Sequence, residues 1–578
     1  MSREYIVLTK DFKGFNLSFG SGWGKFAGKK TYNNPLSFIN DSLRSRPSFS
    51  ENYDYGGKPS YDQWFRGDIS LFGGAEIYVP KANGLKIKIE YDPYDYFDFT
   101  ANNRPDAVYE KRVKDSNINF GLSYPINRFL SLDAAYIKGN TFNFSFNIAL
   151  GMKKDLIKKN TFKPKLSIKD NPNKIKKIFY EELLKNLNEN NLLLQTASLK
   201  EEKLNIAISN ADYRNAIRAS SNAVTISKKI IDEHQIKVNS ISLTQINAGV
   251  ELNKITYPIN FFDDKKSIPI EVKKRYVNFD SGNKNSYLKN EFRPNIDFPI
   301  IFSEFKPIIV NHIGNPEKFY FGGIALQNES EIQFSRNLLL TTEINYSIYN
   351  NFEDTVSGPG SKMQHVRTDL VQYLKNSEFY ISRMQLDYLW SPFKNIYAKM
   401  SAGIFEMMYA GIGTEFLYTP FKNNFYINLN SFYVKQREFD QKLEFRDYET
   451  STGHLSLGYI FPKGVESKIS YGRYLAKDDG YTFDLSRELN SGFRAGFYFT
   501  RTDVPSEIFG EGSFDKGFYF KFPLDLFTKD YIGGYTEFKL SPLTRDGGAK
   551  LVYGKDLQGL IHNSTKYRLR RNWDEFNN

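Results

Sequence analysis

The sequence predicts a mainly β protein of antiparallel strands, with a small α/β module between two strand-rich regions. Apolar and polar residues alternate over many segments, which is the period of a strand that buries one face. Aromatic residues make up 16% of the 578 residues, with 39 Tyr and 50 Phe, and they favour strands. Between about 154 and 297 the apolar spacing becomes helical instead. This length allows two or three domains.

The first region, 1–153, reads as consecutive strands joined by polar turns. Phe15, Leu17 and Phe19 alternate with polar or small residues near the start of the chain. The segments "GLKIKIEYD" and "TFNFSFNIALG" repeat this alternation, and "YPINR" and "KGN" are typical of short turns. The polar stretch 27–64 is expected to be a loop.

The second region, 154–297, begins with the basic, proline-containing linker "KKDLIKKNTFKPK". Apolar residues then recur at helical spacing from Ile175, and two short strands are expected near 191–199 and 203–210. A second helix is predicted at 213–233 with Asp212 as its N-cap, followed by one strand near 237–252.

In the third region, 298–578, apolar and polar residues alternate again, along its whole length. In "SGFRAGFYFT" and "KGFYFKFPL", aromatic residues alternate with polar or small ones. Roughly a dozen such segments of about ten residues occur, a length that crosses a bilayer at a tilt of about 45°. A β-sandwich also buries one face of each strand. The number and length of the strands favour a closed transmembrane barrel over a sandwich.

Composition narrows the chemistry. The chain has no cysteine, which excludes disulfides and thiolate metal sites and suits an oxidising compartment. The chain contains no run of about 18 apolar residues, so no transmembrane helix is predicted. The mean hydropathy is low, at −0.51. The net charge of +12 fits either a solvated basic surface or a surface for acidic glycans or lipid headgroups. The N-terminus carries no secretory signal pattern.

Several longer motifs occur in a fixed order along the chain. They include "EYIVLTKDF", "WFRGDISLFGGAEIYVP", "LNIAISNADYRNAIRA", "SKMQHVRTDLVQYLK", "FEMMYAGIGTEFLYTP", "YGRYLAKDDGYTFDLSREL" and "LTRDGG". In these motifs the chain resembles the YjbH-like outer-membrane family of exopolysaccharide and group 4 capsule assembly.

The resemblance implies a protein of the Gram-negative outer membrane, built as two barrels joined by a periplasmic module and acting in polysaccharide production or export. It implies outer-membrane lipid, the extracellular polysaccharide and other envelope proteins of a lipoprotein-associated pathway as partners, with no nucleic acid and no cofactor. Family members begin with a secretory signal and further strands, so we expect this chain to be an N-terminally truncated member. The end, "RNWDEFNN", lacks a terminal aromatic residue, although Trp573 and Phe576 lie nearby.

Enzyme chemistry finds little support in the sequence. The five histidines form no two-histidine metal spacing; they are His234, His312, His365, His454 and His562. His454 and Ser456 share a strand face, a weak hint of a hydrolase. The acidic segments "YDPYDYFDF" and "KDDGYTFD" could serve a glycosidase or bind calcium, but acidic turns are common. Glycines in "GIGTEF" and "FGEGSFDKG" read as structural. No catalytic residue, cofactor site or metal site is predicted.

Charged residues in mid-strand supply the remaining candidates. If the apolar strand face meets lipid, the lumen would hold four cations and four anions, namely Arg383, Lys468, Arg494, Lys521, Glu343, Asp387, Glu415 and Glu466. Such a lumen either contacts a sugar chain or is a salt-bridged, plugged interior. The preferred function is a non-enzymatic outer-membrane barrel of exopolysaccharide or capsule export. The alternatives are a general porin and a barrel-borne enzyme that modifies glycan or lipid.

Overall fold

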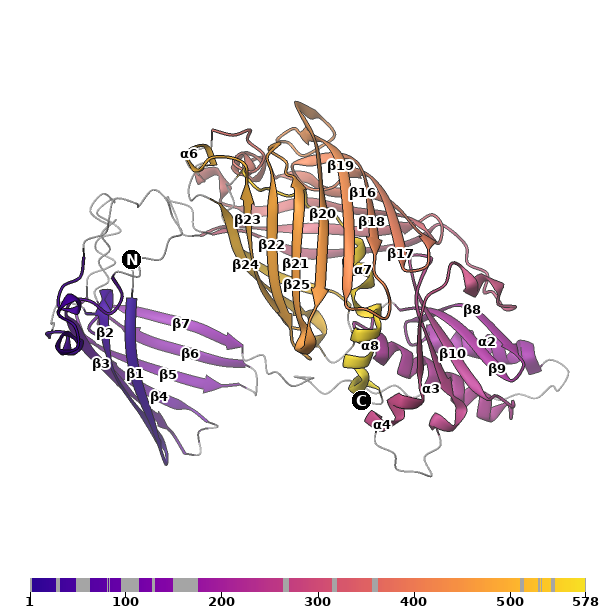
Figure 1. Ribbon diagram of the computed structural model, residues 1–578, viewed down its shortest axis with the longest axis horizontal. Coiled ribbons are helices and arrows are strands. Elements are labelled where there is room, and N and C mark those ends of the chain that lie inside the picture. Colours follow the sequence, from indigo (N-terminus) through magenta and orange to yellow (C-terminus); the bar gives the residue numbers. More distant parts are fainter. Residues whose placement is uncertain are drawn as a thin grey trace. The chain divides into compact units, whose positions relative to one another are not determined.

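The computed structural model divides the chain into two compact units, residues 1–156 and 157–578, which are described separately (Figure 1). The structure describes residues 3–27, 32–47, 63–80, 82, 84–94, 114–126, 130–148, 175–210, 212–262, 270–313, 320–355, 362–509, 514–528, 531, 533–541 and 546–576. The basic linker that the sequence singles out, residues 153–165, lies outside these ranges. Strands dominate both units and pair almost entirely antiparallel, so the predicted mainly β class is confirmed.

The first unit contains a seven-stranded antiparallel sheet in chain order. Its strands are β1 (Arg3–Phe12), β2 (Phe15–Gly24), β3 (Ile69–Tyr78), β4 (Lys86–Tyr91), β5 (Ile118–Pro125), β6 (Leu130–Ile137) and β7 (Thr141–Ile148). A short 3-10 helix, η1 (Lys25–Ala27), follows β2, and the described part of the stretch expected to be a loop holds two more, η2 (Pro35–Phe38) and η3 (Asp41–Leu43). One face of β7 is apolar and open, since the side chains of Phe142, Phe144 and Phe146 are all more than 70% exposed.

The second unit begins with an α/β module. Two helices, α2 (Ile175–Asn188) and α3 (Ala216–Glu233), pack on a five-stranded sheet of order β12-β11-β10-β9-β8. The strands are β8 (Leu192–Lys200), β9 (Lys203–Asn210), β10 (Ser240–Asn247), β11 (Val250–Pro258) and β12 (Asn278–Ser281). β9 and β10 pair in parallel through the crossover helix α3. The chain reaches the next sheet through α4 (Ile270–Lys273) and the 3-10 helices η8 (Ile259–Phe262), η9 (Lys274–Tyr276) and η10 (Ser286–Lys289).

Two details of the module correct the sequence prediction. Helix α3 begins at residue 216, and its N-cap is Asn215, whose side chain accepts from the backbone N–H of Ile217 at 2.9 Å, so Asp212 as N-cap was wrong. The single strand expected near 237–252 is a hairpin, β10 and β11, turned at Ala248 and Gly249. Both residues have positive φ, which is the geometry of a tight two-residue hairpin turn. Alanine rarely adopts it, so the sequence gives no turn signal there.

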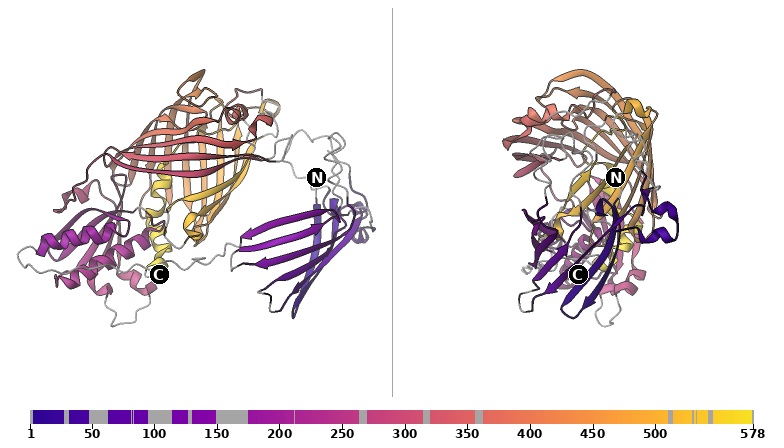
Figure 2. Two further views of the ribbon diagram at one scale, coloured as in Figure 1. Left: turned by 180° about the vertical axis from the view of Figure 1, so that it is seen from behind. Right: turned by 90° about the vertical axis from the view of Figure 1, so that its left-hand side faces the viewer.

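A 13-stranded antiparallel sheet follows, with every strand paired to its neighbours in chain order. The sheet is strongly curled (Figure 2). Its strands are β13 (Ile300–Ile313), β14 (Tyr320–Gln333), β15 (Leu338–Asn350), β16 (Phe379–Phe393), β17 (Ile396–Ile404), β18 (Tyr409–Tyr418), β19 (Phe425–Arg437), β20 (Phe445–Ile460), β21 (Val465–Arg473), β22 (Asp479–Glu488), β23 (Arg494–Thr502), β24 (Asp515–Pro523) and β25 (Tyr535–Leu540). Within the described residues, β13 and β25 are its edges and no pairing joins them, so closure into a barrel stays a prediction.

The two faces of this sheet have opposite character. Phe416, Leu429, Leu455 and Tyr471 lie directly opposite one another on β18–β21, and each of these apolar side chains is exposed. We call this the outer face. On the other side, the inner face, charged and polar residues such as Glu415 lie in mid-strand and are buried. An ordinary soluble sheet shows the reverse arrangement.

Candidate functional site: the polar inner face and the C-terminal segment

The inner face is covered by the chain's own C-terminal segment, residues 546–576. This segment contains α7 (Leu557–Ile561), η14 (His562–Ser564), α8 (Lys566–Arg571) and η15 (Trp573–Glu575). Helices α7 and α8 run beside the strands toward the α/β module (Figures 1 and 2). The segment is held at four successive places, by a loop beside the sheet, by side chains of the sheet at two points and by the α/β module.

The first place is the start of the segment, which contacts the loop between β15 and β16. Asp546 is fully buried, and its carboxylate accepts from the backbone N–H groups of Val366, Arg367 and Thr368 at 2.7 to 3.0 Å. Arg367 in turn pairs with Glu406 at 2.9 Å. Hydrogen bonds to a charged carboxylate are stronger than those between neutral groups, so these contacts hold the loop at 366–368 to the segment. We call this group of contacts the cap.

A buried arginine completes the cap. Arg437, at the end of β19, is almost wholly buried, and its guanidinium donates to backbone carbonyls of Ile381, Glu406, Met407, Gln441 and Lys442. Three of the motifs quoted from the sequence, at 361–375, 405–420 and 543–548, therefore meet here. Their shared role in the structure is to fix the loops at this end of the sheet.

Next, Lys399 of β17 holds the backbone of the segment in mid-sheet. Its ammonium group donates to the carbonyls of Gly554 and Lys555, each at 2.9 Å. It also lies 3.8 Å from Asp387 and 3.7 Å from Glu415. Both carboxylates and the ammonium group are almost wholly buried, so each needs the others to offset the cost of desolvation.

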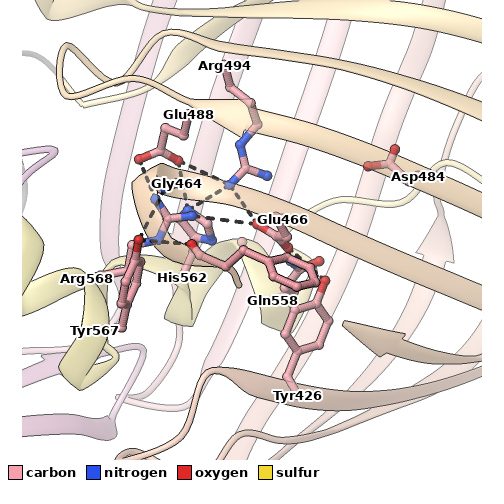
Figure 3. Close-up of polar contacts among 12 residues, drawn as sticks. Tyr426, Gly464, Glu466, Asp484, Glu488, Arg494, Gln558, His562, Tyr567 and Arg568 are labelled. Atoms are coloured by element: carbon pink, nitrogen blue, oxygen red, sulfur yellow. Dashed lines mark hydrogen bonds and ion pairs between the residues drawn. The ribbon is translucent and has the colours of Figure 1, made fainter. Parts of the chain in front are cut away.

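A third cluster joins β21, β22 and β23 to α8 (Figure 3). Arg494 donates to Glu466 at 3.0 Å and to Glu488 at 3.1 Å. Arg568 donates to the other oxygen of Glu488 at 2.8 Å. His562 lies between them, 3.0 Å from Glu488 and 2.8 Å from Arg494. Two carboxylates and two guanidinium groups balance in this cluster, which accounts for their burial.

The segment finally enters the core of the α/β module. Trp573 is fully buried there and Phe576 nearly so, both packed against Tyr257 and Phe261. Glu575 pairs with the buried Arg218 of α3. Burial raises the pKa of the Tyr257 hydroxyl, which also hydrogen-bonds to Ser220 at 2.6 Å. The C-terminal segment therefore links the cap, the inner face and the module in one chain of contacts.

The structure places the eight residues predicted for the lumen on the inner face, and most are paired. Seven of the eight have an ion-pair partner within the chain: Arg383 with Glu343, Arg494 with Glu466, Lys521 with Glu537, and Asp387 and Glu415 with Lys399. For the eighth, Lys468, the structure shows no ion pair among the described residues. The sequence left two interpretations open, contact with a sugar chain or a salt-bridged interior, and the ion pairs of these seven residues are those of a salt-bridged interior.

The other candidate residues from the sequence, His454, Ser456 and the acidic segments, have the following contacts within the fold. His454 and Ser456 do not contact each other; the hydroxyl of Ser456 meets that of Ser470 at 2.8 Å. Asp478 accepts from the N–H of Gly548, and Asp479 pairs with Arg473. Most of "YDPYDYFDF" lies outside the described residues. In the part of the chain that the structure describes, no group of three or more metal-ligating side chains is placed to hold an ion.

Sequence reasoning missed the C-terminal segment and the residues that hold it. Leu569, Trp573 and Phe576 recur at i, i+4 and i+7, while Arg568 and Arg571 lie three apart. This amphipathic spacing was a readable signal of a packed helical segment. Lys399 and Glu488 carried no comparable signal, because mid-strand charges look alike whether or not another segment covers them.

The fold and this site define a class of protein: a largely β chain whose curled 13-stranded sheet is apolar outside and holds its own C-terminal segment inside. None of the helices in the described residues is both long and apolar enough to cross a membrane. The family model described as exopolysaccharide biosynthesis protein YbjH matches residues 1–563. The chain therefore belongs to the YjbH family.

Relatives agree with this assignment. The protein named uncharacterized lipoprotein YjbH, from Escherichia coli strain K12, is 28% identical over 585 residues, which covers 95% of this chain and 78% of that protein. Two solved structures of the in-vitro folded Vibrio cholerae outer membrane protein OmpT, one as a trimer, are 9% and 8% identical. Each covers 45% of this chain, with 96% and 94% of their own lengths matched, at a TM-score of 0.21, and supports no further argument.

Proposed function

We propose that this protein is a non-enzymatic outer-membrane β-barrel that takes part in the biosynthesis and export of an extracellular polysaccharide or capsule. Membership of an exopolysaccharide biosynthesis family supports the pathway. The α/β module is proposed to lie in the periplasm, where it meets other envelope proteins of the same pathway.

The observation that supports a location in the membrane is that the 13-stranded sheet exposes its apolar face and buries its polar face, the reverse of a soluble sheet. Its outer face exposes a continuous apolar row, from Phe416 on β18 to Tyr481 on β22. Its inner face buries charge in ion pairs. Apolar-out and polar-in alternation is the arrangement of strands that face lipid. Exposed apolar surface of this extent needs a covering phase or partner.

The way the inner face is filled supports a role other than free diffusion through a wide pore. The C-terminal segment occupies the wall from β16 to β23. We therefore propose that the barrel acts on the polymer or on its partners through defined contacts, with the segment as a fixed part of the interior.

The proposal is tested by measuring polysaccharide in separate compartments of a strain that lacks the gene. Surface, released and periplasmic polymer are measured, with the complete gene restored as the control. Loss outside with accumulation inside is expected for a role in export. An unchanged amount and distribution, under conditions in which the polymer is made, would overturn the proposal. Measurable single-channel conductance together with that unchanged output would support a porin instead.

A further inference from the structure

We propose that the inner face of β20–β25 carries a binding site for an acidic saccharide, formed by Lys468, Lys539 and Lys550 around the rings of Tyr498 and Tyr519. The inference rests on the proposed function and names the chemical class of its ligand. It concerns a part of the inner face where, among the described residues, three lysines have no ion-pair partner.

The three lysines lie close together on the inner face, with Lys550 within electrostatic reach of both Lys468 and Lys539. Lys468 lies on β21 directly opposite Asp484 of β22. Lys550, from the C-terminal segment, is repelled by both Lys468 and Lys539 and attracted by Asp484 and Asp515. Among the residues that the structure describes, none of the three lysines forms an ion pair. Three cations thus face two carboxylates, in contrast to the balanced clusters around Glu488 and Lys399.

Two tyrosine rings lie beside these lysines on the sheet, since Tyr498 is directly opposite Asp484 and Tyr519 is directly opposite Lys539. The ring of Tyr519 covers Gly496, since a Cβ there would lie 2.5 Å from it, and the ring of Tyr498 covers Gly517 in the same way at 2.8 Å. Glycine on the neighbouring strand is therefore required for both rings to lie flat on the wall. The ammonium group of Lys539 lies 4.9 Å from the centre of the Tyr498 ring. An aromatic platform beside a cation suits a sugar ring that carries an anionic group.

Asp484, the carboxylate opposite Lys468, is already engaged. The hydroxyl of Tyr519 donates to it at 3.0 Å. This hydrogen bond orients the ring and occupies one carboxylate oxygen, so Asp484 offsets less of the charge of the lysines.

His454 supplies an independent sign of a missing ligand. Its side chain is only 6% exposed, and its Nε2 atom has no hydrogen-bond partner among the described residues. It lies within electrostatic reach of both Lys468 and Lys550, and its ring meets that of Tyr474 edge-on at 4.7 Å. A buried polar nitrogen without a partner is costly, and a sugar hydroxyl would satisfy it.

The face on which the site lies and its positive charge favour an acidic saccharide over a lipid headgroup or a neutral sugar. A lipid headgroup would reach the outer face, where the apolar side chains are exposed, whereas these lysines lie on the opposite face. A neutral sugar would leave the excess of positive charge over the two carboxylates without a counter-charge. A carboxylate-bearing saccharide meets both the charge and the aromatic wall.

The test uses the full chain purified in detergent and calorimetric titration with tetragalacturonate, with maltotetraose as the neutral probe. Tetragalacturonate is expected to bind, more weakly at high salt, and maltotetraose is not. Lys550→Gln and Lys468→Gln should each weaken binding roughly tenfold, the size expected for loss of one charged hydrogen bond. Lys516→Gln is the matched control, because Lys516 lies on β24 one position from Gly517 and therefore points to the opposite face.

Equal affinity for both probes, or unchanged affinity in folded Lys550→Gln and Lys468→Gln variants, would overturn the inference. Circular dichroism establishes that each variant is folded, and Lys539→Gln serves in place of either variant that is not. If the expected binding is not observed but the deletion strain still accumulates polymer in the periplasm, the saccharide site is wrong and the proposed function stands. If the binding results hold while the deletion strain makes and exports normal polymer, the proposed function falls.

Discussion

Arg568 in helix α8 donates to Glu488 on β22 at 2.8 Å, across 80 residues of sequence. The guanidinium is fully buried, and Glu488 is shared with Arg494 and His562. This ion pair ties the C-terminal segment to the sheet wall at the point where the segment turns into the α/β module. It is one of several contacts that join the parts of the second unit, beside the ion pair between Arg214 of the module and Asp525.

The first prediction breaks this pair. Arg568→Met keeps most of the buried volume but leaves Glu488 with less counter-charge, so we expect the free energy of unfolding to fall by about 3–5 kcal/mol. Urea unfolding in detergent measures the change. Arg570→Met in the same helix is the control, since Arg570 is exposed and should shift the free energy by under about 0.5 kcal/mol. Equal stability of the two variants would contradict the role given to Arg568.

The second prediction concerns the anchor of the segment in the module. Trp573→Ala removes a fully buried indole from a cluster with Tyr257, Phe261 and Phe279, and should cost about 3–5 kcal/mol. Faster protease cleavage within 557–576 is the expected readout. Tyr276→Ala, which truncates an aromatic side chain 59% exposed in the same module, is the control and should leave cleavage unchanged. Protection that survives in Trp573→Ala would show that the segment is held elsewhere.

The third prediction tests the cap. Asp546→Asn removes the charge that receives three backbone N–H groups and the Thr368 hydroxyl, and we expect a loss of about 1.5–3 kcal/mol. Hydrogen exchange at the amides of residues 366–368 should speed up. Asp447→Asn, at an exposed position on β20, provides the comparison. If exchange at 366–368 is the same in both variants, Asp546 does not order this loop.

The fourth prediction places charge on the outer face. Ile412 is 61% exposed in mid-strand on β18, so Ile412→Arg should lower stability in lipid by about 2–4 kcal/mol if that position lies near the bilayer centre. Folding yield into lipid vesicles reports the effect. Leu443→Arg changes a residue of similar exposure in the turn between β19 and β20 and should be tolerated. Equal folding yields would argue that the outer face does not meet lipid.

The sequence predicted the strands well because each carries its own signal. Alternation at Leu455 and Leu457, for example, follows from one strand having two different faces, whatever lies beside it. Helix α2 and the strand pair β8 and β9 were predicted for the same local reason. The hairpin turn at Ala248 and Gly249 was missed, because a left-handed alanine depends on the surrounding sheet rather than on local preference.

The site was predicted only in part. Glu466 and Arg494 were identified as inner-face charges, but Arg568, which lies 3.6 Å from Glu466, belongs to a helical segment far along the chain. The sequence shows that a buried charge needs a partner without showing which of many charges supplies it. That choice follows from tertiary packing of residues 546–576, which local pattern does not encode.

The central claim is that the apolar outer face lies in a membrane, and the absence of cysteine allows a direct measurement. Single cysteines placed at Leu455, on the outer face, and at Leu443, in a turn, are labelled with a fluorophore in the folded protein in lipid vesicles. Lipids that carry a nitroxide on the acyl chain should quench the label strongly at 455 and weakly at 443. Equal or absent quenching at both positions in folded protein would contradict the account.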